Sequence, residues 1–307
     1  MYYAHILTTL REILAHIRMP QFFFFAAAFA LGIGTALYAA HATALLFTDL
    51  ATTVRLSILG AIITYLLWAA SCMTNDIYDV AIDRISNPQR PLPRHVVSTR
   101  VYHIIALSAN FAALALAYTL GKTPLLLCLV SIIIHYAYNM PPLRLKRVPF
   151  VATLLGSTSI QIVIFMGFWA AAQHYHLTTT YPYTPGYILF AIVTVSLIIP
   201  LKDIKDIDGD RANGISTFPV LFGVRATIFI AALAASIYLY TPFFVTDTLT
   251  PPVVAGVTLV VCVMLSIVYS VTLSDAREKR PIAPHKILAW LTVPALLYLG
   301  ILLAIFL

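Results

Sequence analysis

Charged residues are scarce in this sequence of 307 residues. Only 10% of them are charged and 61% are hydrophobic, whereas a typical soluble domain has roughly 25% charged residues. Acids are the scarcer sign, with 12 Asp and Glu against 19 Lys and Arg. This shortage of charge excludes a water-soluble globule and predicts a protein embedded in a lipid bilayer.

Cysteine and histidine patterns typical of metal or disulfide proteins are also missing. The three cysteines, Cys72, Cys128 and Cys262, lie far apart and show no metal-ligand spacing, and the nine histidines show no such pattern either. We interpret the cysteines as small packing residues within predicted spans. A zinc site or a disulfide framework is therefore not expected.

Uncharged runs are what the sequence has in abundance. A helix that crosses a bilayer needs about 20 consecutive, mostly apolar residues. Nine such spans are predicted, within 19–48, 56–75, 101–121 and 123–143, twice within 148–201 on either side of a polar stretch at 174–186, and within 226–246, 248–274 and 287–307. Residues 1–19 place apolar side chains at helical spacing, so we expect an amphipathic surface helix rather than a cleaved signal. The predicted fold class is all-α, a polytopic membrane protein with one nine-helix domain at 20–307.

The basic residues predict the orientation of these spans. With the N-terminus in the cytoplasm, all of the 19 Lys and Arg except Arg55 and Lys122 fall in cytoplasmic segments. Such an excess is typical of cytoplasmic loops. The net charge of +7 therefore requires no nucleic-acid partner, and no obligate protein partner is predicted.

Two short stretches, 75–83 and 203–210, hold seven of the 12 acids and leave the membrane on the same predicted side. In a helix, steps of three and four residues would align three aspartates of each stretch on one face. The aligned residues are Asp76, Asp79 and Asp83, and, at a constant offset of 127, Asp203, Asp206 and Asp210. Asp208 points away from the second face and is the weakest candidate. The offset indicates two similar halves.

Aspartates three and four residues apart repel each other on a helix, so each triplet needs a positive counter-charge to be stable. A bound cation would supply it, and oxygen ligands without His or Cys suit Mg²⁺. The predicted metal ligands and catalytic residues are the six aligned aspartates, with Asn75 as a further ligand. A solvated acidic loop explains one such stretch equally well, but two matched copies near the membrane favour a functional site.

Basic side chains flank both acidic stretches and suggest a metal-bridged polyanion. The candidates for binding such a substrate are Asn75, Arg90, Arg94, Arg144, Lys146 and Lys202. Basic loops are also what membrane topology requires, so a structural role for each cation is the competing interpretation. Because these cations exceed what one diphosphate needs, we expect a second, anionic substrate, with Arg94 helping to hold it.

With these residues in view, the chain resembles the UbiA superfamily of intramembrane prenyltransferases. Residues 75–83, followed by Asn87-Pro88-Gln89-Arg90-Pro91-Leu92-Pro93, look like its first aspartate motif. Tyr138 with the segment 141–146 is similar to its Tyr and Lys segment, which adds Tyr138 to the substrate-binding candidates. Residues 202–211, then Gly214, Thr217, Pro219 and Gly223, look like its second aspartate motif.

The resemblance implies a ring of nine helices around a central cavity, with a cytoplasmic cap. The implied reaction transfers a prenyl group from a polyprenyl diphosphate to an acceptor, with two Mg²⁺ ions holding the diphosphate. The sequence departs from the family pattern at two points: Arg94-His95 replaces a small residue, and the Arg-Thr pair of the hydroxybenzoate branch is missing. The missing pair argues against a hydroxybenzoate acceptor. The second motif looks more like branches that prenylate glycerol phosphates, chlorophyllides or homogentisate.

Two other functions stay open on the sequence. A membrane terpene cyclase of the same superfamily would ionise the same diphosphate and quench the cation internally. A cation transporter would also place carboxylates in helices, but transport sites lie near the membrane midplane rather than at helix ends.

Overall fold

The computed structural model describes residues 19–239, and in these residues the only regular secondary structure is helical. The helices are α2 (Met19–Ala39), α3 (Leu45–Thr48), α4 (Leu50–Tyr78), α5 (Val80–Ser86), α6 (Thr99–Leu120), α7 (Lys122–Asn139), η1 (Leu145–Arg147), α8 (Val151–His174), α9 (Pro185–Ile198), η2 (Ile199–Asp206), α10 (Ile207–Ala212) and α11 (Phe218–Leu239). The chain divides into two compact units, Met1–Pro182 and Tyr183–Leu307, and each is described by itself.

Each of the first seven predicted spans contains one long helix. Six segments of the described chain are long and apolar enough to cross a membrane, which confirms a multi-pass helical protein. The helix α7 is not among the six, and its sequence contains the polar residues Lys122 and Asn139 at its ends and His135 within it. The surface helix at 1–19, apart from the first residue of α2, and the spans at 248–274 and 287–307 lie outside the described residues, so nine crossings stay a prediction.

Local sequence determines where several helices begin. The carboxylate of Asp49 accepts a hydrogen bond from the Thr52 backbone N–H and caps α4. The Ser98 hydroxyl does the same for α6, and that of Thr184 for α9. Each cap satisfies a backbone donor that the first helical turn leaves unpaired.

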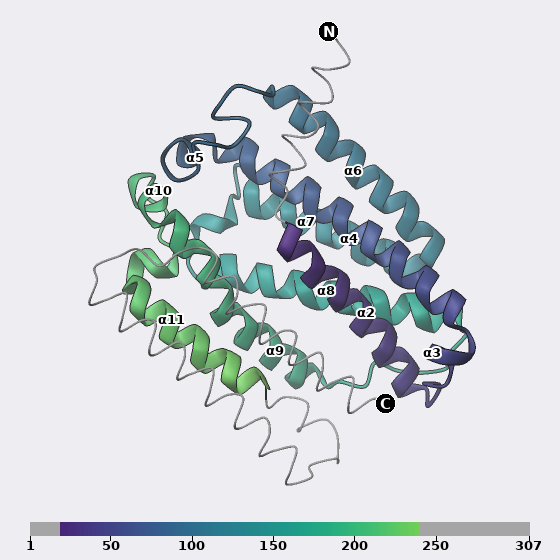
Figure 1. Cartoon of the computed structure of the whole chain (residues 1–307). Helices are drawn as coiled ribbons and strands as arrows, with labels where there is room; N and C mark the ends of the chain where they lie inside the picture. The colour runs from purple at the N-terminus through teal and green to yellow at the C-terminus, as the bar shows by residue number, and fades with distance from the viewer. Residues whose placement is uncertain (1–18, 240–307) are drawn as a thin grey trace. The chain divides into compact units, whose positions relative to one another are not determined.

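In the first unit, α4 packs against α2, α6 and α7, and α8 packs against α2 and α7 (Figure 1). Glycine allows the closest of these approaches, between α2 and α8. A Cβ atom at Gly167 would lie 2.0 Å from the carbonyl oxygen of Phe29, and one at Gly32 would lie 2.0 Å from that of Ile164. The two backbones therefore touch, a packing mode common between membrane helices.

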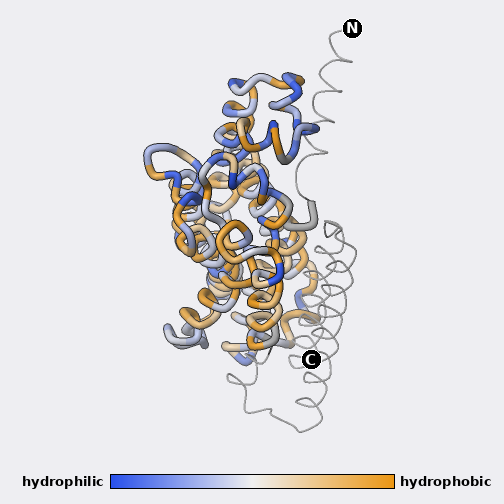
Figure 2. Tube along the Cα trace, turned by 90° about the vertical axis from the view of Figure 1, so that its left-hand side faces the viewer, coloured by the Kyte–Doolittle hydropathy of each residue, from blue (hydrophilic) through white to orange (hydrophobic). Residues whose placement is uncertain are grey.

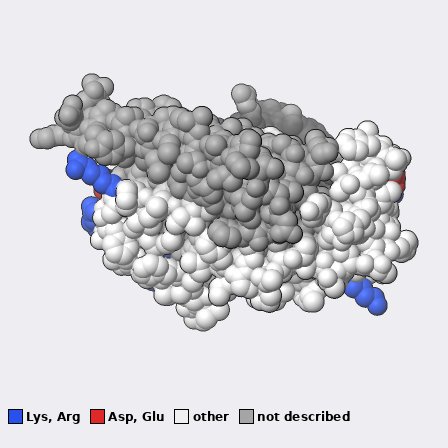
Figure 3. Space-filling model, turned by 90° about the horizontal axis from the view of Figure 1, so that it is seen from below, with Lys and Arg blue, Asp and Glu red and all other residues white. Residues whose placement is uncertain are grey.

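The outer faces of these helices are apolar. Phe111 and Tyr118 of α6, for example, are each 70% exposed. Figure 2 shows hydrophobic residues recurring along the helical segments. On the face drawn in Figure 3, the described surface is almost free of Lys, Arg, Asp and Glu. Exposed apolar surface of this extent fits contact with lipid.

In the second unit, α9 and η2 both pack against α11. Leu201, Ile204, Ile228 and Ala231 form its buried cluster. Gly223 has a positive φ of 80° and kinks α11, a conformation that glycine adopts without steric cost.

The two acidic stretches do not form continuous helices, so the expectation of one α-helical face for each triplet is wrong. The first stretch breaks at Asp79, which ends α4 and precedes α5. The second passes from the 3-10 helix η2 to α10 at Asp206. Asp79 (φ −109°, ψ 13°) and Asp206 (φ −102°, ψ 5°) nevertheless share one backbone conformation at equivalent junctions. The 127-residue correspondence therefore extends to the backbone of the middle aspartate.

Candidate active site

The first acidic stretch is buried at the C-terminal end of α4. Asp76, Asp79 and Asp83 are 6%, 8% and 2% exposed, and Asn75 is partly buried beside them. Carboxylates are rarely buried unless they are paired. The partners of these three aspartates therefore decide what the site can do.

Arg90 joins Asp76 to Asp83. One guanidinium nitrogen, Nη1, lies 2.9 Å from Asp76 Oδ1 and 2.6 Å from Asp83 Oδ2. The Asn87 side chain also donates to Asp83, at 3.0 Å. Although α4 and α5 are separate helices, this arginine brings their two carboxylates to a single point.

Asp79 has a different set of partners, contributed by three segments. Asn75 Nδ2 donates to Asp79 Oδ2 at 2.9 Å, and Arg144 Nη2 donates to Oδ1 at 3.0 Å. Lys146 Nζ lies 2.5 Å from the same Oδ1. Arg144 is in the left-handed region, with a φ of 39°, and its Nη2 also donates to the Tyr78 carbonyl at 2.7 Å. Its Nε is buried and has no hydrogen-bond partner within residues 19–239.

Asn139, at the end of α7, is a site residue that the sequence analysis missed. It is 1% exposed, and its Oδ1 accepts from Asn75 Nδ2 at 3.0 Å and from Lys146 Nζ at 3.5 Å. Its Nδ2 donates to the His135 carbonyl at 3.0 Å. Asn139 therefore helps to position two of the three partners of Asp79, Asn75 and Lys146. The signal available in the sequence was an asparagine next to Tyr138 at the end of a long apolar run.

The electrostatic balance of this cluster corrects one step of the sequence analysis. The three acids pair with three cations, so the counter-charge comes from the chain itself. The acids are Asp76, Asp79 and Asp83, and the cations are Arg90, Arg144 and Lys146. A bound metal is therefore not needed to explain why the triplet is tolerated.

Asp83 is the acid most strongly affected by burial. Burial raises the pKa of its carboxyl to about 6, although Arg90 lowers that pKa and Asp76 raises it further. The charged form of Asp83 is thus tolerated in the fold at neutral pH chiefly because Arg90 pairs with it.

The second acidic stretch has partners within its own unit. Asp210 is 7% exposed, and its Oδ2 accepts from the Thr217 hydroxyl at 3.2 Å. Asp203 lies 3.2 Å from Lys202. Asp206 is partly buried, whereas the Asp208 side chain is 83% exposed and only 3.9 Å from Arg211. The low ranking of Asp208 agrees with this exposure.

Two further predicted site residues, Arg94 and Tyr138, belong to the first unit. Arg94 is exposed, and its backbone N–H donates to the Arg90 carbonyl at 3.2 Å. Tyr138 is partly buried. Their assignment to substrate binding stays a prediction.

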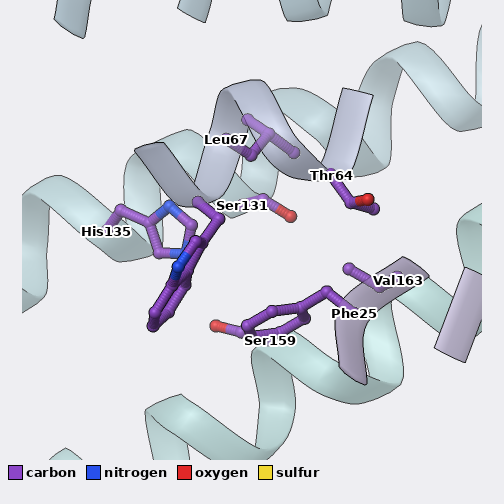
Figure 4. Close-up of a pocket in the computed structure, with 8 residues that line it drawn as sticks. Phe25, Thr64, Leu67, Ser131, His135, Ser159 and Val163 are labelled. Atoms are coloured by element: carbon purple, nitrogen blue, oxygen red, sulfur yellow. The ribbon is translucent and has the colours of Figure 1, made fainter. Parts of the chain in front are cut away.

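A pocket lies within the first unit among α2, α4, α7 and α8. It is lined by Phe25, Thr64, Leu67, Trp68, Ser131, His135, Ser159 and Val163. Figure 4 shows His135 and Ser131 of α7 at the same opening as Ser159 of α8. Three hydroxyls and one imidazole thus face an otherwise apolar space.

A comparison with known families decides the identity of the chain, since residues 27–293 match the model of the UbiA prenyltransferase family. The chain belongs to this family. Among curated UbiA relatives, the digeranylgeranylglyceryl phosphate synthase of Thermococcus sibiricus is 29% identical over 57% of this chain and 59% of its own length. The 2-acyl-4-prenylphloroglucinol 6-prenyltransferase of Humulus lupulus is 32% identical over 52% of this chain and 40% of its own. The matches thus span less than two thirds of these relatives.

Solved structures support the UbiA fold over almost the whole chain. A UbiA homologue from Archaeoglobus fulgidus bound to DMAPP and Mg²⁺ has a TM-score of 0.64 at 16% identity, covering 96% of this chain and 99% of that one. A UbiA homologue from Aeropyrum pernix has a TM-score of 0.59 at 20% identity, covering 91% and 98%. At these identities the likeness concerns the fold alone.

The donor set of this UbiA member fits Mg²⁺. Within residues 19–239, no three His, Cys, Asp or Glu side chains are grouped so that they could hold a metal ion. Mg²⁺, however, typically takes one or two carboxylates and completes its shell with water and substrate phosphates. Asp76 and Asp83 both approach Arg90 Nη1, which shows that a cationic atom fits between their oxygens. The unpaired Arg144 Nε adds a buried donor suited to a phosphate oxygen.

Proposed function

We propose that this protein is a Mg²⁺-dependent membrane prenyltransferase that moves a polyprenyl group from its diphosphate to a small or lipid-like acceptor. The observation that carries the proposal is the buried cluster of three aspartates, Asn75 and three cations at the end of α4. Such a cluster combines oxygen donors for Mg²⁺ with donors for phosphate. The family match and the relatives named as prenyltransferases support it.

The metal ligands in this proposal are Asn75, Asp76, Asp79 and Asp83 in the first unit and Asp203, Asp206 and Asp210 in the second. When bound, Mg²⁺, as two ions, would neutralise charge on the diphosphate while the allylic C–O bond breaks. Arg90, Arg144, Lys146 and Lys202 are the proposed diphosphate ligands, and Tyr138 lines the prenyl end. The Arg144 Nε supports the assignment of Arg144 to the diphosphate, because this buried donor has no acceptor among the described residues.

The chain's own residues connect this site through side-chain hydrogen bonds. Asn139 and Asn75 fix the position of Lys146 and of Asp79 through hydrogen bonds of 3.5 Å or less. Burial of the carboxylates keeps water from screening them, so each charge acts more strongly than it would in solution. Preorganised charges of this kind stabilise the negative charge that develops on the diphosphate as it leaves.

The function is tested with purified protein, geranylgeranyl diphosphate and a panel of acceptors. We expect prenyl transfer and diphosphate release with Mg²⁺, loss of both in EDTA, and recovery when excess Mg²⁺ is restored. The panel contains geranylgeranylglyceryl phosphate, homogentisate and a hydroxybenzoate. Full turnover in EDTA, or no diphosphate release under any condition, would refute the proposal.

The acceptor is proposed to carry a phosphate or carboxylate that Arg94 helps to hold. The side chains of Arg90 and Lys146 pair with buried aspartates, whereas the side chain of Arg94 is exposed and accessible to a substrate. Arginine pairs bidentately with phosphate and carboxylate. Relatives named digeranylgeranylglyceryl phosphate synthases support a phosphate-bearing acceptor.

Arg94→Ala is expected to raise the KM for the acceptor at least about 10-fold while the KM for prenyl diphosphate changes little, because one charge-assisted contact contributes roughly 1.5–3 kcal/mol. Steady-state kinetics with each substrate varied in turn measure the two values. Arg100→Ala, another exposed arginine, is the matched control. Unchanged values for both substrates in Arg94→Ala, or a preference for an uncharged acceptor, would contradict the assignment.

We also propose that both acidic stretches lie on the cytoplasmic side, supported by the placement of all basic residues but Arg55 and Lys122. Single cysteines introduced near Asn87, at the exposed Gln89, and at the exposed Ala212 are expected to react with a membrane-impermeant maleimide only when the cytoplasmic face is accessible. A cysteine at Lys122 is the control and should react from the opposite side. Labelling of positions 89 and 212 from opposite sides would contradict this topology.

A further inference from the structure

A polar stripe runs along one face of α7, a helix that is otherwise largely apolar. Ser131, His135 and Asn139 follow each other at four-residue intervals, which places them on the same side of the helix. Ser131 and Asn139 are 2% and 1% exposed. The stripe therefore faces the interior of the first unit, with His135 between its two buried ends.

The helix α4 presents a matching face. Thr64, Trp68 and Asn75 lie within about 40° of each other on that helix, at 100° per residue. Asn75 at one end of this face donates to Asn139 at the end of the α7 stripe, at 3.0 Å. Thr64 and Trp68 line the pocket with Ser131 and His135. The pocket and the acidic cluster therefore lie along the same seam between α4 and α7.

The depth of His135 follows from helix geometry. At about 1.5 Å of rise per residue, His135 lies roughly 6 Å below Asn139 along the axis of α7. Its carbonyl accepts the Asn139 side chain, and Asn139 in turn accepts Lys146. The backbone of His135 is thus about one helical turn from Asn139, which contacts two of the groups that surround Asp79.

Among the eight residues that line the pocket, only His135 has a side-chain nitrogen with a basic lone pair, and the neutral imidazole can accept a proton there. The hydroxyl hydrogens of its polar neighbours are already committed to backbone carbonyls. Thr64 donates to Gly60 at 2.8 Å, Ser131 to Leu127 at 3.0 Å and Ser159 to Leu155 at 2.9 Å. The remaining walls are apolar, with the rings of Phe25 and Trp68 5.2 Å apart.

An ionisable side chain among membrane-embedded helices costs free energy and points to a function. The proposed reaction leaves one need unmet by the acidic cluster, because an acceptor hydroxyl must lose its proton when it is prenylated. The aspartates are paired with Arg90, Arg144 and Lys146 and are assigned to the metal. The imidazole is the group in this part of the first unit that is suited to take that proton.

We propose that the imidazole of His135 accepts the proton of the acceptor's hydroxyl group during prenyl transfer. The inference rests on the proposed function. The acceptor oxygen forms a bond to C1 of the prenyl group, the bond from C1 to the diphosphate oxygen breaks, and the diphosphate leaves with the electron pair. The hydroxyl proton moves to a ring nitrogen of His135 and passes to water when the products leave.

The proposal separates two steps that can be measured independently. His135→Gln and His135→Ala are expected to lower the kcat of transfer to geranylgeranylglyceryl phosphate, or to the phenolic hydroxyl that the wild type uses best, at least about 100-fold. Acceptor-independent release of diphosphate from geranylgeranyl diphosphate, and the KM for that donor, should stay within about threefold of wild type. Added imidazole should restore part of the transfer in His135→Ala.

Cys128→Ala is the control for packing, because Cys128 is also buried on α7 and is 0% exposed; its transfer rate should stay close to wild type. Thermal unfolding in detergent checks that each variant is folded, and His135→Gln preserves most of the side-chain volume should the alanine variant fail to fold. Transfer by His135→Gln within about threefold of wild type would overturn the proposal. So would a parallel fall of transfer and diphosphate release, or prenylation at ring carbon alone. If the wild type releases no diphosphate either with or without an acceptor, the proposed function is refuted, and the His135 assignment with it.

Discussion

Asp79→Ala and Asp206→Ala are each expected to lower turnover at least about 100-fold, the scale seen when a preorganised electrostatic group is removed from an active site. Asp79 accepts hydrogen bonds from Asn75 and Arg144 and pairs with Lys146, so its loss removes a proposed metal ligand and leaves two cations without this partner. Asp206 occupies the equivalent helix junction in the second unit, with nearly the same backbone angles. The same loss is expected for Asp76→Ala and Asp203→Ala.

Single-turnover release of diphosphate at saturating geranylgeranyl diphosphate is the measurement, because it reports bond cleavage without depending on the acceptor. Asp208→Ala is the matched control, since it removes an aspartate from the same stretch whose side chain is 83% exposed. Its turnover should fall far less. Near-normal release in both Asp79→Ala and Asp206→Ala would exclude the metal role of the two stretches, whereas a loss in Asp208→Ala of equal size would point to general damage.

Arg90→Ala is expected to destabilise the fold by about 3–5 kcal/mol, the cost of leaving buried charges without their partner. Arg90 pairs with Asp76 and Asp83 through a single nitrogen, and both carboxylates are buried. Burial already raises the pKa of Asp83 to about 6, and Arg90 opposes that shift. Removing Arg90 therefore raises this pKa further and makes the charged form costlier at neutral pH.

Unfolding in mixed detergent micelles measures the effect, with Arg84→Ala as the control because Arg84 is exposed on the neighbouring helix α5. Adding Asp83→Asn to Arg90→Ala should recover part of the lost stability, since a neutral amide needs no cation. The double variant isolates the pair in the manner of a mutant cycle. A destabilisation below about 1 kcal/mol in Arg90→Ala would show that the pairs with Asp76 and Asp83 contribute little.

The sequence was sufficient to predict what depends on local composition. Each of the first seven predicted spans contains a long helix, because crossing a bilayer requires a continuous apolar segment that is visible in the sequence itself. The two acidic stretches were recognisable for the same reason, since seven acids stand out where charge is otherwise scarce. The spacing of their aspartates also identified Asp79 and Asp206 as equivalent positions.

The helical geometry of those stretches could not be predicted from spacing. A continuous α-helix would align Asp76, Asp79 and Asp83, but α4 ends before Asp79 and α5 begins after it. In the second stretch, η2 is a 3-10 helix up to Asp206. The aspartates of the first stretch meet their partners through tertiary contacts instead. Periodicity describes only residues that belong to one regular element.

The sequence by itself thus determined that the chain is a multi-pass helical protein and which residues belong to its acidic motifs. The tertiary structure decided which cations neutralise these acids, that Asn139 fixes Asn75 and Lys146, and that His135 faces a pocket on the same seam. The Arg144 contact with Asp79 joins residues 65 positions apart, and the Asn75 contact with Asn139 joins residues 64 apart. Such pairs depend on how helices pack, because side-chain hydrogen bonds form only where the fold brings two segments within about 3 Å.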